Sequence, residues 1–241
     1  SVITEHQAAD VTFSKWVRRR KELGSRDRRF LSQIVFSHFR WYGWTRKKLK
    51  LELKESFLIA ALIESSDASQ WIELLRDKMP NLSALAPMGK LSLADVLFKI
   101  NSFYSASLST YDLFPLNASS VIPEEIMERC IEAYQKRPPT WLRIRSASES
   151  FNMALKQAGI SYSVHDRISN AIRISPGISL QQKIGGLSGQ FAIQDITSQC
   201  VGLVSEAKAG ESWWDCCSGA GGKALQLADL MSQEGEIYAS D

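Results

Sequence analysis

The sequence contains no long hydrophobic run. None of its apolar stretches approaches the roughly 20 residues that a membrane-spanning helix needs. The residues that follow Ser1 do not have the basic and apolar segments of a signal peptide. A hydrophobic content of 44% with 23% charged residues is typical of globular proteins that bury a core. We therefore predict a cytoplasmic protein that has no membrane partner.

Cysteine is also scarce. Cys130, Cys200, Cys216 and Cys217 show no C-x-x-C spacing, and two adjacent cysteines form neither an ordinary disulfide nor a comfortable pair of zinc ligands. We expect reduced thiols, no metal and a monomeric protein.

Acidic residues are rare near the N-terminus. Residues 15–50 contain 13 Lys or Arg and two Asp or Glu, a net charge of +11, whereas the rest of the chain contains 16 and 24, a net charge of −8. Such segregation of charge is the electrostatic pattern expected for binding to a phosphate backbone.

Residues 1–115 are predicted to form a helical, basic, RNA-binding domain. Apolar residues recur there at three- and four-residue spacing, and strand-like alternation is rare. Helices are expected from residue 25, with His38 on the buried face, at 51–63, at 68–78, and after Ser92 as N-cap.

Ten basic residues are candidates for RNA contacts. They are Arg18, Arg19, Arg20, Arg28, Arg29, Arg46, Lys47, Lys48, Arg143 and Arg145. A solvated helix face explains the N-terminal clusters equally well. Three interleaved rings, Trp41, Tyr42 and Trp44, favour RNA if they are exposed and stack on unpaired bases, but core positions are an open alternative.

After a linker at 111–123, residues 120–187 are predicted to form a small α/β domain. We expect helices at 124–136 and 147–158, and strands at 141–145, 161–165 and 171–175. Arg143 and Arg145 alternate with Leu142 and Ile144, which places both arginines on the face opposite the core, where they can meet phosphate. Two ordinary surface arginines are the alternative interpretation.

Residues 188–241 are predicted to begin a nucleotide-type α/β domain. A loop at 185–190 and a helix at 193–204 precede a buried strand at 212–217, a glycine-rich turn, a helix at 223–231 and a strand at 236–240 that ends in Asp241. Amides of such a turn can hold an anionic group, and a carboxylate at the next strand's end can accept hydrogen bonds from ribose hydroxyls.

The glycine turn also shows which nucleotide it suits. A Walker loop is excluded, because Cys217 stands where its first glycine is needed and Ala224 replaces the hydroxyl that binds magnesium. A dinucleotide fingerprint is a weak alternative, because Ala224 also takes the place of its third glycine. S-adenosylmethionine fits better, with its carboxylate on the turn and its ribose at Asp241.

Three motifs, in order, resemble those of RNA (cytosine-5) methyltransferases of the bacterial Sun/Fmu type, which are related to eukaryotic nucleolar proteins. PTWLRIR at 139–145 resembles the family's P-x-W-L-R-V-N, and GQFAIQDITSQ at 189–199 resembles G-x-F-x-V-Q-D-x-x-S-Q. The third, family D-x-C-A-A-P-G-G-K-T, is matched at Asp215, Cys217, Gly221, Gly222 and Lys223. Within this third motif, the chain departs from the family at 218–220, which read Ser-Gly-Ala where the family has Ala-Ala-Pro, and at Ala224, where the family has Thr.

The resemblance implies an α+β multidomain protein: an all-helical N-terminal domain, a small α/β subdomain like an RNA-recognition motif, and the beginning of a Rossmann-like methyltransferase domain. It implies S-adenosylmethionine as cofactor, ribosomal RNA as partner, and 5-methylcytosine as product. The residues expected to bind the cofactor are Cys217, Ser218, Gly219, Ala220, Gly221, Gly222, Lys223 and Asp241.

Methylation of cytosine carbon 5 requires a thiolate that adds to the ring, because only the adduct makes that carbon nucleophilic. In the resembling family, the motifs that carry the two cysteines of this chemistry follow the segment matched here, so we expect the nucleophile after Asp241 and no catalytic residue within 1–241. Residues 1–241 alone are expected to be inactive. The alternative is a non-catalytic RNA-binding protein with a vestigial cofactor loop.

Overall fold

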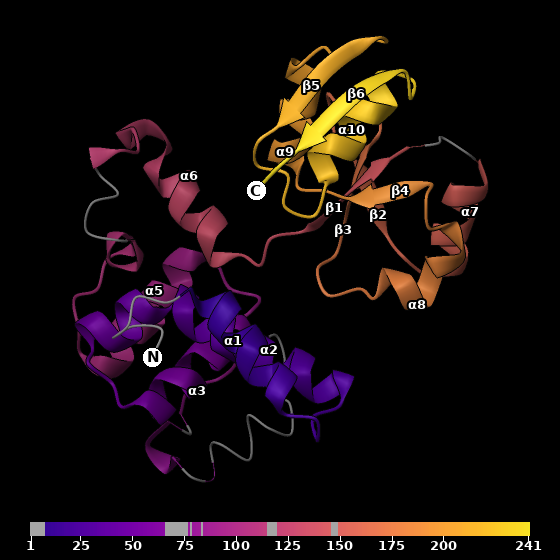
Figure 1. Cartoon of the computed structure of the whole chain (residues 1–241). Helices are drawn as coiled ribbons and strands as arrows, with labels where there is room; N and C mark the ends of the chain where they lie inside the picture. Colours follow the sequence, from indigo (N-terminus) through magenta and orange to yellow (C-terminus); the bar gives the residue numbers. More distant parts are fainter. Residues whose placement is uncertain (1–7, 66–76, 78, 83, 115–119, 146–148) are drawn as a thin grey trace. The chain divides into compact units, whose positions relative to one another are not determined.

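The computed structural model describes residues 8–65, 77, 79–82, 84–114, 120–145 and 149–241. Contacts divide the chain into two compact units, 1–136 and 137–241 (Figure 1). The predicted helix at 68–78 and part of the predicted linker lie outside the described residues. Helix α6 belongs to the first unit, so this division lies at 136/137 and not in the linker where the sequence suggested it.

Every element in the described part of the first unit is helical. Its elements are α1 (Ala9–Arg19), α2 (Ser25–Arg40), η1 (Gly43–Lys48), α3 (Leu53–Glu64), η2 (Pro80–Leu82), α5 (Leu93–Tyr104), η3 (Thr110–Leu113) and α6 (Glu124–Gln135). Ser92 caps α5 as expected, because its hydroxyl accepts a hydrogen bond from the Asp95 amide at 3.2 Å.

Two tryptophans lie in the core of this unit. Trp41 and Trp44 are 4% and 0% exposed, and the Trp44 indole N–H donates to the Ser109 carbonyl at 2.7 Å. The alternative that these rings are core residues is therefore correct for both, and stacking on bases is excluded for them in this structure. Arg40 grips Glu64 through two hydrogen bonds of 2.7 and 2.6 Å, which join α2 to α3.

His38 begins a buried hydrogen-bond relay between the same helices. Ser56 Oγ donates to Thr45 Oγ1 at 2.7 Å, and Thr45 Oγ1 donates to the Trp41 carbonyl at 2.9 Å. Since both hydroxyl protons are used, Ser56 Oγ accepts from His38 Nδ1, 3.0 Å away, and the neutral imidazole carries its proton there. Burial, together with the nearby Arg46 charge, lowers the pKa of His38 to about 4.

The second unit begins with a four-stranded antiparallel sheet in the order β2-β3-β1-β4. The strands are β1 (Thr140–Ile144), β2 (Tyr162–Val164), β3 (Ala171–Ile174) and β4 (Phe191–Ile193), with α7 (Glu149–Gln157) and α8 (Leu180–Ile184) between them. This β-α-β-β-α-β order is the ferredoxin-like arrangement. One face of the sheet packs with the helices in a core of Leu142, Phe151, Leu155, Ile160, Ile172, Ile174, Leu180 and Ile184.

Strand β4 corrects two predictions. The sequence suggested a helix from residue 193 and a domain boundary at 187/188, whereas Phe191–Ile193 pairs with β1 and completes the first sheet. Helix α9 begins only at Ile196 and ends at Val204. Asp195 is the N-cap of this helix, because its side chain accepts a hydrogen bond from the Thr197 amide at 2.8 Å. The helix therefore starts after Asp195 and not at residue 193.

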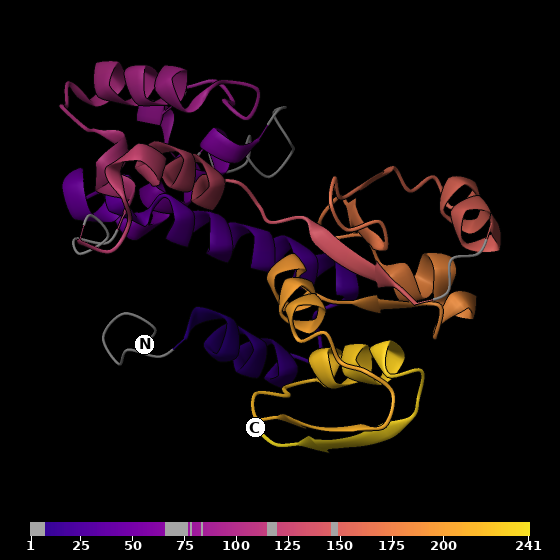
Figure 2. The same ribbon diagram turned by 90° about the horizontal axis from the view of Figure 1, so that it is seen from above.

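A second, parallel sheet follows. Strand β5 (Glu211–Asp215), helix α10 (Gly222–Leu230) and strand β6 (Gly235–Ala239) form one β-α-β unit, with α10 against one face of the two strands (Figure 2). The predicted strand at 212–217 is shorter, and it is not buried on both faces. Trp213 packs on the small core under α10, but Trp214 points the other way and is 69% exposed, because the described residues cover only one face.

Candidate cofactor site

The carboxyl end of β5 leads into a glycine turn that exposes its backbone. Gly219 and Gly221 adopt left-handed φ angles of +51° and +83°, which favour glycine. Gly221 is also the N-cap of α10, and no side chain in the described structure caps that end. The first amides of α10 therefore lack a side-chain acceptor, and an anionic group can fill that role.

Two charged side chains, Lys223 and Asp215, bond to the backbone of the turn at Cys217. Lys223 Nζ donates to the Cys217 carbonyl at 2.6 Å and lies 3.8 Å from Asp215 Oδ1. Asp215 is buried, and its Oδ1 accepts from the Cys217 amide at 3.3 Å. Its Oδ2 has no hydrogen-bond partner among the described residues. Asp215 is not among the site residues predicted from the sequence, although its place at the end of a strand before a glycine turn is a usable signal.

The last residue lies at the same turn. Gly219 donates its amide proton to Asp241 Oδ1 at 3.2 Å. Main-chain bonds hold this approach, because Ser218 donates to the Ser240 carbonyl and Ser240 donates to the Asp215 carbonyl, each at 3.0 Å. All the residues predicted to bind the cofactor, 217–223 and Asp241, therefore belong to one continuous site. That they bind a cofactor stays a prediction.

The shape of the turn fits a small anionic cofactor. A Cβ atom added at Gly219 or Gly221 would have no described atom within 4 Å, so the space above both residues is open. Open space, amides without a side-chain cap and a carboxylate at the neighbouring strand end are the features that a carboxylate-bearing nucleoside needs.

The Cys217 thiol does not have the character of an activated nucleophile. Cys216 and Cys217 are exposed. A hydrogen bond with Cys216, and repulsion from its charged form, raise the pKa of the Cys217 thiol above its ordinary value. A raised pKa leaves less thiolate at neutral pH, whereas catalytic cysteines have a lowered pKa.

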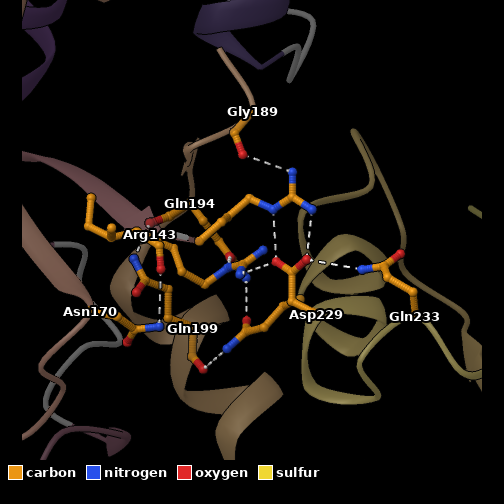
Figure 3. Close-up of polar contacts among 10 residues, drawn as sticks. Arg143, Asn170, Gly189, Gln194, Gln199, Asp229 and Gln233 are labelled. Atoms are coloured by element: carbon orange, nitrogen blue, oxygen red, sulfur yellow. Dashed lines mark hydrogen bonds and ion pairs between the residues drawn. The ribbon is translucent and has the colours of Figure 1, made fainter. Parts of the chain in front are cut away.

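Arg143 in β1 and Arg145, the residue after the strand, point to the same side, as predicted, but that side is covered. Arg143 is 3% exposed, and its Nη1 donates to Asp229 Oδ2 at 2.6 Å. Arg145 binds both oxygens of the Asp229 carboxylate at 2.9 and 2.7 Å and donates to the Gly189 carbonyl (Figure 3). The prediction that Arg143 meets RNA phosphate is wrong for this structure, because its guanidinium is buried against α10, and Arg145 is also committed to Asp229.

The two arginines favour the ionised form of Asp229. Burial alone would raise the pKa of the Asp229 carboxyl, but hydrogen bonds from Arg145 and Arg143 hold it below its ordinary value. The hydrogen bond to Asp229 likewise raises the pKa of Arg145. Asp229 could not be predicted as the partner, because strand alternation shows which residues share a face and not which element packs on that face.

The eight residues of the first unit that are predicted to contact RNA divide into two groups. Those exposed on the surface are Arg18, Arg19, Arg20, Arg29, Lys47 and Lys48. The half-buried Arg28 and Arg46 donate to the carbonyls of Leu23 and Leu51, and Lys48 also pairs with Asp112 at 2.8 Å. RNA contact stays a prediction for the exposed group.

No described helix combines the length and the apolar character needed to cross a bilayer. In the same ranges, no three His, Cys, Asp or Glu side chains are grouped so that they could hold a metal ion.

Fold and site together define an α+β protein with a glycine-turn β-α-β unit of the type found in nucleotide-binding domains. No family model matches the chain. It is similar to proteins named ribosomal RNA small subunit methyltransferase B. The relative from Pectobacterium carotovorum is 29% identical over 106 residues, and that from Pectobacterium atrosepticum is 30% identical over 102 residues.

These alignments cover 43% and 41% of this chain and about a quarter of each relative, 25% and 24%. Over that part of the chain, the resemblance to the Sun-type ribosomal RNA methyltransferases is confirmed. The solved structure of a protein called PH0851 is similar in fold, with a TM-score of 0.61 over 93% of this chain and 57% of that chain. At 17% identity, this second similarity concerns the fold alone.

Proposed function

We propose that this chain is part of an S-adenosylmethionine-dependent methyltransferase that acts on ribosomal RNA in the cytoplasm. The observation that carries the proposal is the meeting of the left-handed glycine turn with Asp241, 3.2 Å from the Gly219 amide, in a chain similar to proteins named as ribosomal RNA methyltransferases. Neither feature alone distinguishes a methyltransferase from other nucleotide-binding proteins.

The residues of the turn have separate roles in this proposal. Amides of Gly222 and Lys223 hold the carboxylate of the cofactor, while the Gly221 amide closes the turn by donating to the Ser218 carbonyl at 2.8 Å. Asp241 accepts hydrogen bonds from the ribose. Lys223 bonds the Cys217 carbonyl and so fixes the turn's backbone. When bound, S-adenosylmethionine supplies an electrophilic methyl group on a sulfonium centre.

The proposed product is 5-methylcytosine, formed after a cysteine thiolate adds to the base. We place that cysteine outside residues 1–241. The raised pKa of Cys217 supports this, because its thiol is protonated at neutral pH. RNA is the proposed partner of the exposed basic residues in the first unit, whose positive charge matches a phosphate backbone.

The test is transfer of labelled methyl from S-adenosylmethionine to unmethylated ribosomal RNA. Residues 1–241 are compared with a longer protein that carries a methyltransferase domain's remaining strands, and cofactor binding to both is measured by calorimetry. Label on cytosine carbon 5 with the longer protein alone is the expected result. Label with residues 1–241 alone would contradict the placement of the nucleophile. RNA binding without cofactor binding would replace the proposal with the non-catalytic RNA-binding alternative.

A further inference from the structure

Four buried polar side chains connect β1 to the beginning of α10 (Figure 3). Arg143 Nε donates to Gln194 Oε1 at 2.8 Å, and Gln194 Nε2 donates to Gln226 Oε1 at 2.7 Å. Gln226 Nε2 donates to the Gln199 carbonyl at 2.9 Å, and Gln199 Nε2 donates back to the Gln194 carbonyl at 2.9 Å. None of the four residues is more than 5% exposed. We call this set the amide chain.

The direction of the amide chain is fixed by its two ends. A guanidinium can only donate, so Gln194 must present its oxygen to Arg143 and its nitrogen to Gln226. A carbonyl can only accept, so Gln226 must present its nitrogen to Gln199. Reversing either amide would place two donors or two acceptors together in a buried site, which is costly. Only one arrangement therefore satisfies every bond.

The amide chain also lies next to the glycine turn. A Cβ atom at Gly222, the first residue of α10, would lie in van der Waals contact with Gln194 Cγ, at 3.7 Å, so the Gln194 side chain borders the start of the helix. Gln226 lies one turn further along α10. On its other side, a Cβ atom at Gly202 of α9 would lie 2.2 Å from Gln226 Cδ, so α9 approaches by its bare backbone.

We propose that Gln194 and Gln226 are positioning residues of the cofactor site. By tying α10 to β1 through Arg143, they hold the start of the helix in place, and with it the Gly222 and Lys223 amides that would face the cofactor. The inference rests on the proposed function for its consequence in cofactor binding, but its structural part, control of the turn by the amide chain, stands by itself.

Gln194→Glu is the most selective test. It preserves size and the acceptor for Arg143, but it removes the donor to Gln226 and sets two acceptors face to face. We expect faster hydrogen exchange of the amides at 219–223, unchanged exchange in β1 and β3, and about tenfold weaker binding of S-adenosylhomocysteine, the value of one lost buried hydrogen bond. Gln157→Glu, on the exposed side of α7, is the matched control.

Unchanged exchange at 219–223 in a folded Gln194→Glu protein would overturn the proposal. If that variant does not unfold cooperatively, Gln226→Met, which keeps the side-chain length and removes both bonds, is judged by the same exchange measurement. Failure of the unaltered chain to bind S-adenosylhomocysteine would refute the proposed function, while the exchange measurement in the unliganded protein would still decide the role of the amide chain.

Discussion

Asp241 lies beside the glycine turn because β5 and β6 are parallel and therefore end at the same edge of their sheet. Asp241→Ala is expected to weaken binding of S-adenosylmethionine by about 1–3 kcal/mol, since it removes the carboxylate proposed to bind the ribose. Calorimetric titration measures the loss. Glu128→Ala, an exposed carboxylate change on α6, is the control and should leave affinity unaltered. Equal affinities for both variants would remove Asp241 from the site.

His38 makes the stability of the first unit depend on pH. Its pKa in the folded protein is about 4, against about 6.5 in an unfolded chain, so the unfolded state binds more protons below pH 6.5. The contribution of His38 to the unfolding free energy is therefore fully present above about pH 6.5 and is lost as the pH falls towards about 4. Chemical denaturation should show a decrease of about 2 kcal/mol between pH 7 and pH 5 from this residue.

His38→Asn is the variant that tests this assignment. Its side-chain amide can donate to Ser56 as His38 Nδ1 does, yet it does not titrate in this range. The unfolding free energy of this variant should decline much less between pH 7 and pH 5. If it declines as steeply as that of the unaltered protein, the pH dependence comes from other groups.

At the scale of elements, α10 is held to β1 by Asp229. Asp229→Asn leaves Arg143 with a buried charge and weakens two hydrogen bonds to Arg145, so we expect a loss of about 3 kcal/mol in the unfolding free energy. Thermal and urea unfolding measure it. Glu234→Gln, an exposed neighbour beyond α10, should change stability by no more than about 0.5 kcal/mol. A similarly small change at Asp229 would show that the ion pairs contribute little.

Elements with strong local signals were predictable from the sequence. Helix formers after the glycines predict α10, and Ser92 predicts the start of α5. Strand β4 was missed because its three residues become a strand only by pairing with β1, about 50 residues earlier in the chain. The residues of the glycine turn were identified by their motif, whereas Gln194 and Asp229 gained their roles from tertiary packing, which one sequence does not display.

For the whole molecule, the segregated charge predicts salt-dependent RNA binding. Each phosphate contact on a single strand contributes about −0.7 to the slope of log affinity against log salt. Changing Arg18, Arg19 and Lys47 together to Gln should therefore reduce the slope by about 2, measured by filter binding at several salt concentrations. A matched triple change at the exposed Lys99, Lys156 and Lys208, outside the basic segment, should leave it nearly constant. Equal slopes would show that Arg18, Arg19 and Lys47 do not contact RNA phosphates.

Trp214 gives the molecule an optical property of its own. Its ring is 69% exposed on the outer face of β5, and its indole N–H donates to Ser240 Oγ at 3.1 Å, one residue before Asp241. Trp41 and Trp44 are buried in the other unit. Acrylamide should therefore quench Trp214, together with the 43% exposed Trp16, in preference to Trp41 and Trp44. Changing Trp16 to Phe would leave a quenchable emission that reports more directly on the carboxyl end of β5.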